Sequence, residues 1–276
     1  MRIEFLKMQG LGNDFLVFDA PAAGTNLDSS KLRALADRHT GVGFDQALML
    51  EAPRDAQTRV FYRIFNADGS EVEQCGNGAR CIASLLYARA PDLGRALLMG
   101  SPGGTVRAQV REDGTVSVDM GTPNFDPRSL PMDAAAEAPT YSLRVDGVDV
   151  EIGAVSMGNP HAVLRVADVK AAPVERIGPS IERHPRFPKR TNVEFMEIVG
   201  RGHIRLRVFE RGVGETLACG TGACGAVAVG RRHGLLDDQV RVDLPGGTAT
   251  VCWAEATEPV WLTGPATTVF SGSIDI

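Results

Sequence analysis

The sequence predicts a mixed α/β protein of two pseudo-symmetric domains, each a curved, mostly antiparallel sheet or barrel around a central helix. The main observation is a repeat, in which F-N-A-D-G-S-E-V-E-Q-C-G-N-G-A-R-C at 65–81 aligns without a gap with F-E-R-G-V-G-E-T-L-A-C-G-T-G-A-C-G at 209–225. Further landmarks recur in the same order at nearly the same offset, such as P-G-G-T at 102–105 and again at 245–248. Each half also has many short strand-like segments and only two helical ones. An internal duplication explains these observations together.

The first elements follow from periodicity and from helix-capping residues. Residues 1–9 alternate apolar and polar side chains, which predicts a strand. The loop G-L-G-N-D-F at 10–15 leads into a second strand, L-V-F-D, at 16–19. Asp28 can cap a short helix over Lys31–Arg38, whose leucines face inward.

The next segment supplies the central helix of the first half. Strands are expected at Ala47–Glu51 and Arg59–Asn66. A helix is expected at Asn77–Arg89, and Pro91 explains why it ends there. This helix is rich in Ala, as expected for one enclosed by sheet on several sides. Short strands separated by glycine turns are expected from Leu97 to Met120.

The second half repeats this order after a segment rich in Pro, Ala and Asp at 122–139, which we interpret as the join. A short helix at Ser180–His184 corresponds to the first helix of the first half. Equivalent polar positions recur 146 residues apart, with Asn13 matching Asn159 and Gln46 matching Asn192.

Composition and charge exclude several classes of function. The net charge of −5 argues against a general nucleic-acid surface. No apolar run approaches the roughly 18–20 residues that span a bilayer. The first ten residues include Glu4 and Lys7 and look like a strand rather than a signal peptide. Five cysteines without disulfide-like spacing indicate a reducing, cytoplasmic setting.

The repeated cysteines, Cys75 and Cys219, each precede a predicted helix start. The free N–H groups and the positive end of the helix dipole lie there, so the thiol pKa is expected to fall toward neutrality. The Gly-x-Gly that follows each cysteine lets the backbone approach a ligand, and its N–H groups could hold a carboxylate or phosphate.

A pseudo-two-fold relation between the halves would place the two thiols on opposite faces of one bound group. Such a pair suits removal of a proton from one face of a carbon and its return to the other face. The helix dipoles would stabilise the enediolate formed next to a carboxylate. The residues therefore predict a cofactor-independent racemase or epimerase.

The cysteine spacing also resembles that of a zinc site. Cys75 with Cys81 and Cys219 with Cys224 could be paired ligands, but the second members do not align and no histidines complete a set. We expect Cys81, Cys224 and Cys252 to be small buried hydrophobic residues, and no metal to be bound. A disulfide between Cys75 and Cys219 is a further alternative, and we interpret such oxidation as damage that would remove the reactive thiols. Gly10 and Gly12 resemble the start of a dinucleotide-binding loop, but the third glycine of that motif and its βαβ context are missing.

The chain resembles the diaminopimelate epimerases over essentially its full length. Six segments carry the resemblance: G-L-G-N-D-F (10–15), G-F-D-Q-A (43–47), residues 65–81, G-N-P-H (158–161), T-N-V-E-F (191–195) and E-R-G-V-G-E-T-L-A-C-G-T-G-A-C (210–224). The resemblance implies interconversion of LL-2,6-diaminopimelate and its meso form without a cofactor, in lysine biosynthesis.

The resemblance also implies roles for individual residues. Cys75 and Cys219 match the acid–base pair, and His161 and Glu210 match positions that support ionisation of the cysteines. Arg211 would bind the distal carboxylate of the substrate. The full substrate-binding set matched in this way is Asn13, Gln46, Asn66, Gly76, Asn77, Asn159, Asn192, Glu210, Arg211, Gly220 and Thr221.

The resemblance further predicts domain boundaries and an assembly. The final strand is expected to return to the first domain, which gives residues 1–120 with 265–276 as one domain and residues 121–264 as the other. Family members are often homodimers with a tyrosine near the C-terminus at the interface, and Phe270 stands at the matching position, where it could keep the apolar contact but not a hydroxyl hydrogen bond. We expect a small-molecule substrate and no membrane or nucleic-acid partner.

Two other functions are compatible with the sequence. A racemase for proline or hydroxyproline would share the cysteines but would leave Arg211 without a distal carboxylate to bind. An amino-acid-binding protein would bind its ligand without exchanging the alpha proton.

Overall fold

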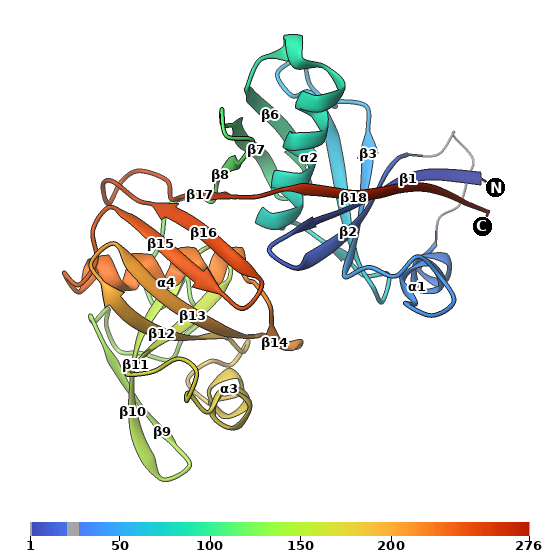
Figure 1. Cartoon of the computed structure of the whole chain (residues 1–276). Coiled ribbons are helices and arrows are strands. Elements are labelled where there is room, and N and C mark those ends of the chain that lie inside the picture. Colours follow the sequence, from blue (N-terminus) through green and yellow to red (C-terminus); the bar gives the residue numbers. More distant parts are fainter. Residues whose placement is uncertain (1, 21–27, 276) are drawn as a thin grey trace. The chain divides into compact units, whose positions relative to one another are not determined.

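The structure, a computed structural model, describes residues 2–20 and 28–275 and is of the predicted mixed α/β class (Figure 1). The chain divides into two compact units. We call Met1–Val118 with Gly264–Ile276 the N-terminal unit, and Asp119–Thr263 the C-terminal unit. The first residue of the predicted opening strand lies outside the described residues.

The N-terminal unit is built on a mostly antiparallel sheet in the order β18-β1-β2-β3-β4-β6-β7-β8, with the short β5 paired to β4. Its strands are β1 (Arg2–Gly10), β2 (Asn13–Asp19), β3 (Gln46–Glu51), β4 (Phe61–Asn66), β5 (Glu71–Val72), β6 (Ala96–Ser101), β7 (Gly104–Val110), β8 (Val116–Asp119) and β18 (Thr267–Asp275). The last strand pairs with the first, so residues from both ends of the chain share one sheet.

The C-terminal unit repeats this sheet in the order β9-β10-β11-β12-β13-β15-β16-β17, with β14 paired to β13. Its strands are β9 (Tyr141–Val145), β10 (Val148–Ser156), β11 (Pro160–Val166), β12 (Asn192–Gly200), β13 (His203–Glu210), β14 (Gly214–Thr216), β15 (Gln239–Leu244), β16 (Gly247–Cys252) and β17 (Trp261–Gly264). The segment predicted as a join, 122–139, contains no strand and no helix.

A matching strand register in the two units confirms the duplication. In one unit Phe15 pairs with Gln46 across the parallel strands β2 and β3, and in the other His161 pairs with Asn192 across β11 and β12. Each partner stands 146 positions beyond its counterpart. Most strand pairs in these two sheets are antiparallel. The occurrence of a parallel strand pair at the same place in both units therefore distinguishes a duplication from a general similarity of sheets.

The cysteine-bearing helices lie against several strands of their own unit (Figure 1). α2 (Gly76–Arg89) contacts β1, β2 and β7, and α4 (Gly220–Arg232) contacts the equivalent β10, β11 and β16 as well as β12. All nine residues from Gly222 to Gly230 are buried, which only small side chains allow on every side of a helix. The predicted enclosed helices are confirmed, and a short 3-10 turn, η1 (Pro91–Leu93), follows α2.

The two outer helices differ from the prediction. α1 (Ser29–Ala36) is capped by Asp28 as expected, but it ends two residues early because Asp37 leaves the helical conformation and caps the next turn instead. α3 (Val174–Glu182) begins six residues before the predicted Ser180 and contains Pro179. Its buried residues Val174, Gly178 and Ile181 follow helical spacing, a signal that the prediction missed.

The helices of the described ranges, 2–20 and 28–275, include none that combines the length and apolar character of a membrane-spanning helix. Each unit has a buried apolar cluster of its own. One is centred on Leu16, Phe18 and Leu32, and the other on Leu143, Ile181 and Phe195.

Candidate active site

Each repeated cysteine is the N-cap residue of its helix. Cys75 and Cys219 have extended backbone conformations, and their sulfur atoms accept the backbone N–H of the third helical residue. The sulfur of Cys75 lies 3.5 Å from the nitrogen of Gly78, and that of Cys219 lies 3.4 Å from the nitrogen of Gly222. The sequence predicted this placement, and it leaves both sulfurs beside the positive ends of helix dipoles.

Cys219 differs electrostatically from the prediction. Its side chain is buried, and burial together with the carboxylate of Glu210 raises its pKa well above the usual value. Glu194 acts in the same direction, whereas hydrogen bonds from Thr221 and Gly222 oppose the rise. The expected lowering of the pKa is therefore wrong for Cys219, because burial and two nearby carboxylates outweigh the helix start.

Polar side chains surround Cys75 in the N-terminal unit. Asn13 begins β2 and donates its amide Nδ2 to Asp45 at 3.0 Å. Its carbonyl Oδ1 then faces the helix start, where it accepts from Asn77 at 3.3 Å and lies 3.8 Å from the sulfur of Cys75. The sequence predicted Asn13 and Asn77 but missed Asp45, which orients the Asn13 amide.

The amides of Gln46 and Asn66 lie beside each other on paired strands. Gln46 donates Nε2 to Oδ1 of Asn66 at 3.0 Å, and Asn66 donates to Ser70 at 3.1 Å. The buried Oε1 of Gln46 has no hydrogen-bond partner among residues 2–20 and 28–275. A buried carbonyl without a donor is costly, so this oxygen is suited to accept a hydrogen bond from a ligand.

A continuous chain of hydrogen bonds leads to Cys219 in the C-terminal unit. Nδ1 of His161 lies 2.6 Å from Oε1 of Glu194, and Nε2 lies 2.9 Å from Oδ1 of Asn159. Asn159 donates Nδ2 to the hydroxyl of Thr221 at 3.3 Å. That hydroxyl lies 3.5 Å from the sulfur of Cys219. His161 and Asn159 were predicted, and the chain connects both to the thiol.

The remaining predicted residues of this unit cluster at the ends of β12 and β13. Asn192 accepts the backbone N–H of Arg211 at 2.9 Å and donates to the carbonyl of Pro160 at 3.0 Å. Glu210 accepts from Thr216 at 2.5 Å. The Arg211 side chain is exposed, with one nitrogen 3.3 Å from the carbonyl of Lys189. Gly76 and Gly220, also predicted, are the first residues of their helices.

Glu194 is the functional candidate that the sequence interpretation missed. It is fully buried in β12, between apolar neighbours, and burial raises its pKa although His161 opposes the rise. A carboxylate in an apolar strand segment such as N-V-E-F-M is the signal that could have identified it, because a buried acid needs a partner.

The five cysteines, all within the described residues, are not joined in disulfides. Cys81 and Cys224 are buried as expected, but Cys252 is partly exposed, so its predicted burial is wrong. Within residues 2–20 and 28–275, no group of three His, Cys, Asp or Glu side chains is arranged as metal ligands would be.

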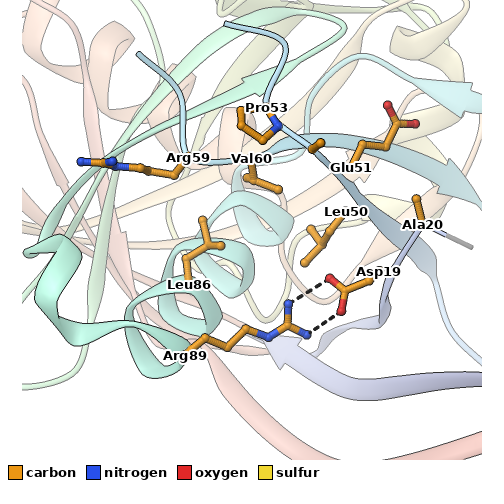
Figure 2. A pocket seen from close by; sticks show the side chains of 10 residues that line it. Asp19, Ala20, Leu50, Glu51, Pro53, Arg59, Val60, Leu86 and Arg89 are labelled. Carbon is orange, nitrogen blue, oxygen red and sulfur yellow. Dashed lines mark hydrogen bonds and ion pairs between the residues drawn. The ribbon is translucent and has the colours of Figure 1, made fainter. Parts of the chain in front are cut away.

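Figure 2 shows a surface pocket of about 370 Å³ in the N-terminal unit. Its apolar floor includes Leu50 and Leu86, and a bidentate ion pair between Arg89 and Asp19 lies at its edge. None of the predicted site residues lines this pocket. It therefore forms no part of the candidate active site.

Comparison with known proteins gives consistent results. A family model described as diaminopimelate epimerase matches residues 5–125 and 153–269. The diaminopimelate epimerase of Thioalkalivibrio sulfidiphilus is 56% identical and that of Nitrosomonas europaea 53%, each over 100% of both chains. A solved hydroxyproline epimerase from Agrobacterium vitis superposes with a TM-score of 0.72 at 15% identity, over 99% of this chain and 92% of that one. The last similarity supports the fold alone.

Proposed function

The chain belongs to the diaminopimelate epimerase family, and we propose that it interconverts LL-2,6-diaminopimelate and meso-diaminopimelate without a cofactor. The observation that carries this proposal is the repeated cysteine N-cap. Two sulfurs, one in each unit, accept a backbone N–H at the first turn of a helix. That position suits a thiol that must gain and lose a proton.

In the proposed reaction, one sulfur acts as a thiolate and removes the alpha proton, so that an S–H bond forms as the C–H bond breaks. The electron pair spreads into the neighbouring carboxylate, and the thiol of the other cysteine delivers its proton to the opposite face. The raised pKa of Cys219 supports this residue as the proton donor of the substrate-free enzyme, with Cys75 as the acceptor. The roles are exchanged after each turnover.

The helix starts would stabilise the reacting carboxylate and the enediolate derived from it. Gly76 and Asn77 begin α2, and Gly220 and Thr221 begin α4, so their backbone N–H groups lie among those without a partner inside the helix. Preorganised N–H donors at developing negative charge are commonly the largest contribution to catalysis.

The distal end of the substrate carries a carboxylate and an ammonium group. The exposed guanidinium of Arg211 is suited to bind that carboxylate through two parallel hydrogen bonds. Ammonium groups need acceptors, and the unpartnered Oε1 of Gln46 and the carboxylate of Glu210 are candidates. Asn13, Asn66, Asn159 and Asn192 complete the proposed binding set.

Replacement of Arg211 by alanine should lower kcat/KM for diaminopimelate by about 10- to 100-fold, since a hydrogen bond to a charged group contributes roughly 1.5–3 kcal/mol. Steady-state kinetics measures this loss. Arg165 is an exposed arginine on β11 and serves as the matched control, for which Arg165→Ala should retain wild-type kinetics. Unchanged kcat/KM in Arg211→Ala would rule out the proposed binding of the distal carboxylate.

The direct test of the activity is incubation of the purified, reduced protein with LL-diaminopimelate, and chiral chromatography of the product. Proline and trans-4-hydroxyproline are assayed in parallel, because those substrates lack the distal group. Formation of the meso isomer supports the proposal. Turnover of either cyclic amino acid in its place, or binding of diaminopimelate without any conversion, would contradict it.

We propose further that the enzyme serves lysine biosynthesis in the cytoplasm. A homodimer through β18 is part of this proposal. Phe270 on that strand is 47% exposed and stacks edge-on against Phe5, with ring centroids 6.1 Å apart. It could make apolar contacts across a dimer interface, and analytical ultracentrifugation of Phe270→Asp against the wild type would test the assembly.

A further inference from the structure

The two units match closely around their thiols but differ in the layer beneath the helix starts. Strand register makes His161 equivalent to Phe15, and Glu194 equivalent to Leu48. The N-terminal unit therefore has two apolar side chains where the C-terminal unit has a histidine and a glutamate. A duplicated scaffold thus folds around an apolar pair, so packing alone does not require the polar one.

The polar pair is completely buried and lies directly under the first turn of α4. His161 and Glu194 each have a relative exposure of 0%. A Cβ atom added to Gly222 would lie 2.9 Å from Oε1 of Glu194, and one added to Gly78 would lie 3.1 Å from a methyl carbon of Leu48. Both glycines follow their cysteine by three residues, and the added Cβ at Gly222 would also lie 3.3 Å from the sulfur of Cys219, so Glu194 lies close to the Cys219 cap.

The hydrogen-bond partners determine how many protons the pair holds. Nε2 of His161 faces the carbonyl oxygen of Asn159, which can only accept, so Nε2 must carry a proton. Nδ1 faces a carboxylate oxygen, so a second proton must lie between Nδ1 and Glu194. The pair thus holds two protons and is neutral overall, which reduces the cost of its burial.

This protonation state is consistent with the orientation of the Asn159 amide. Oδ1 of Asn159 faces Nε2 of His161, and the amide Nδ2 donates to the hydroxyl of Thr221. That hydroxyl then has its own proton available for the sulfur of Cys219. In the N-terminal unit Asp45 accepts Nδ2 of Asn13 instead, and the carbonyl oxygen faces the helix start. The two side-chain amides are thus turned in opposite directions: Asn159 presents its Nδ2 to the helix start, and Asn13 presents its Oδ1.

We propose that Glu194 is a positioning residue for the reaction. It keeps His161 protonated on Nε2 and thereby directs a hydrogen-bond donor, the Thr221 hydroxyl, to the sulfur of Cys219. A donor at the sulfur stabilises the thiolate that remains when Cys219 gives up its proton. The inference rests on the proposed role of Cys219 in proton transfer.

The surroundings of Cys219 oppose formation of its thiolate. Glu194 and His161 approach Cys219 from β12 and β11, and Glu210 approaches from β13. Both glutamates raise the pKa of the Cys219 thiol, and burial raises it further. Without the donor, the Cys219 thiolate would be harder to form.

The test compares Glu194→Gln with Glu197→Gln. Glutamine keeps the shape of Glu194 but cannot share a proton with Nδ1. Glu197 lies on the same strand, where it accepts from the backbone of Val169 at 2.9 Å and pairs with Arg205. Carboxylate partners that orient metal-bound histidines contribute about 10–100-fold in activity, and we expect a loss of kcat in this range for Glu194→Gln. Glu197→Gln should retain kcat near the wild-type value.

The second measurement is the nitrogen-15 spectrum of labelled histidine in the substrate-free protein. We expect the wild type to show a protonated Nε2 on His161, and Glu194→Gln to show a changed Nδ1 signal with the other histidines unaffected. An unprotonated Nε2 in the wild type would overturn the proposal, even if the variant failed to fold. Wild-type kcat in Glu194→Gln, or an equal loss in Glu197→Gln, would also overturn it.

These measurements separate this inference from the proposed function. The histidine spectrum requires no substrate, so it tests the hydrogen-bond chain whatever the reaction is. Failure of the wild type to convert diaminopimelate would reject the proposed function and leave the spectral result intact.

Discussion

Replacement of either Cys75 or Cys219 by serine is expected to lower kcat by about 10²- to 10⁴-fold, the range attributed to a positioned acid or base. A serine hydroxyl does not ionise near neutral pH, so it cannot replace the thiolate. Both residues are N-caps, and serine is among the preferred N-cap residues. The variants should therefore fold with undiminished stability while losing activity.

Assays of turnover and thermal unfolding on the same samples measure both effects. Cys252→Ala is the control, because Cys252 is a partly exposed cysteine on β16 outside the proposed site. It should retain wild-type turnover. Substantial activity in either serine variant would rule out the two-thiol mechanism. A large fall in the unfolding temperature would instead mean that the cysteines are structural.

Gly222→Ala should lower kcat by about 100-fold, since a misplacement of roughly 1 Å at a reacting group can cost this much. The added Cβ would lie 2.9 Å from Oε1 of Glu194 and 3.3 Å from the sulfur of Cys219. Both side chains are buried, so one of them must shift. Overpacking of this kind typically costs about 1–3 kcal/mol of folding stability.

Gly200→Ala is the matched control for this substitution, because a Cβ at Gly200 would have no heavy atom of the described residues within 4 Å. Kinetics and thermal unfolding of the two variants should diverge, with Gly200→Ala close to wild type. Wild-type turnover in Gly222→Ala would mean that Glu194 and Cys219 are not held as closely as the structure indicates.

Local sequence signals were sufficient for the features that depend on local structure. The Cys-Gly pair after a strand predicted both N-caps, and the repeat at 65–81 and 209–225 predicted two matching units. Asp28 as a cap follows from side-chain chemistry that acts over three residues. The start of α3 was misplaced, since Pro179 lies inside a helix whose apolar spacing begins at Val174.

Features that depend on tertiary contacts could not be predicted in the same way. The pKa of Cys219 depends on its burial and on Glu194 and Glu210, which stand on other strands. The position of Cys219 at a helix start, taken alone, predicted that its thiol pKa would be lowered. The pairing of His161 with Glu194 likewise requires the register of β11 and β12, which no local pattern supplies. The resemblance to a known family identified His161 but not its partner.

The measurement that tests the central claim most directly is conversion of LL-diaminopimelate in deuterated water, with mass and stereochemical analysis at early times. The two-thiol account predicts that newly formed meso product carries one deuterium at the inverted carbon, while the remaining LL substrate carries none. Each thiol serves one face, so solvent deuterium enters only on the product face. Unlabelled meso product, or equal early labelling of substrate and product, would contradict the account.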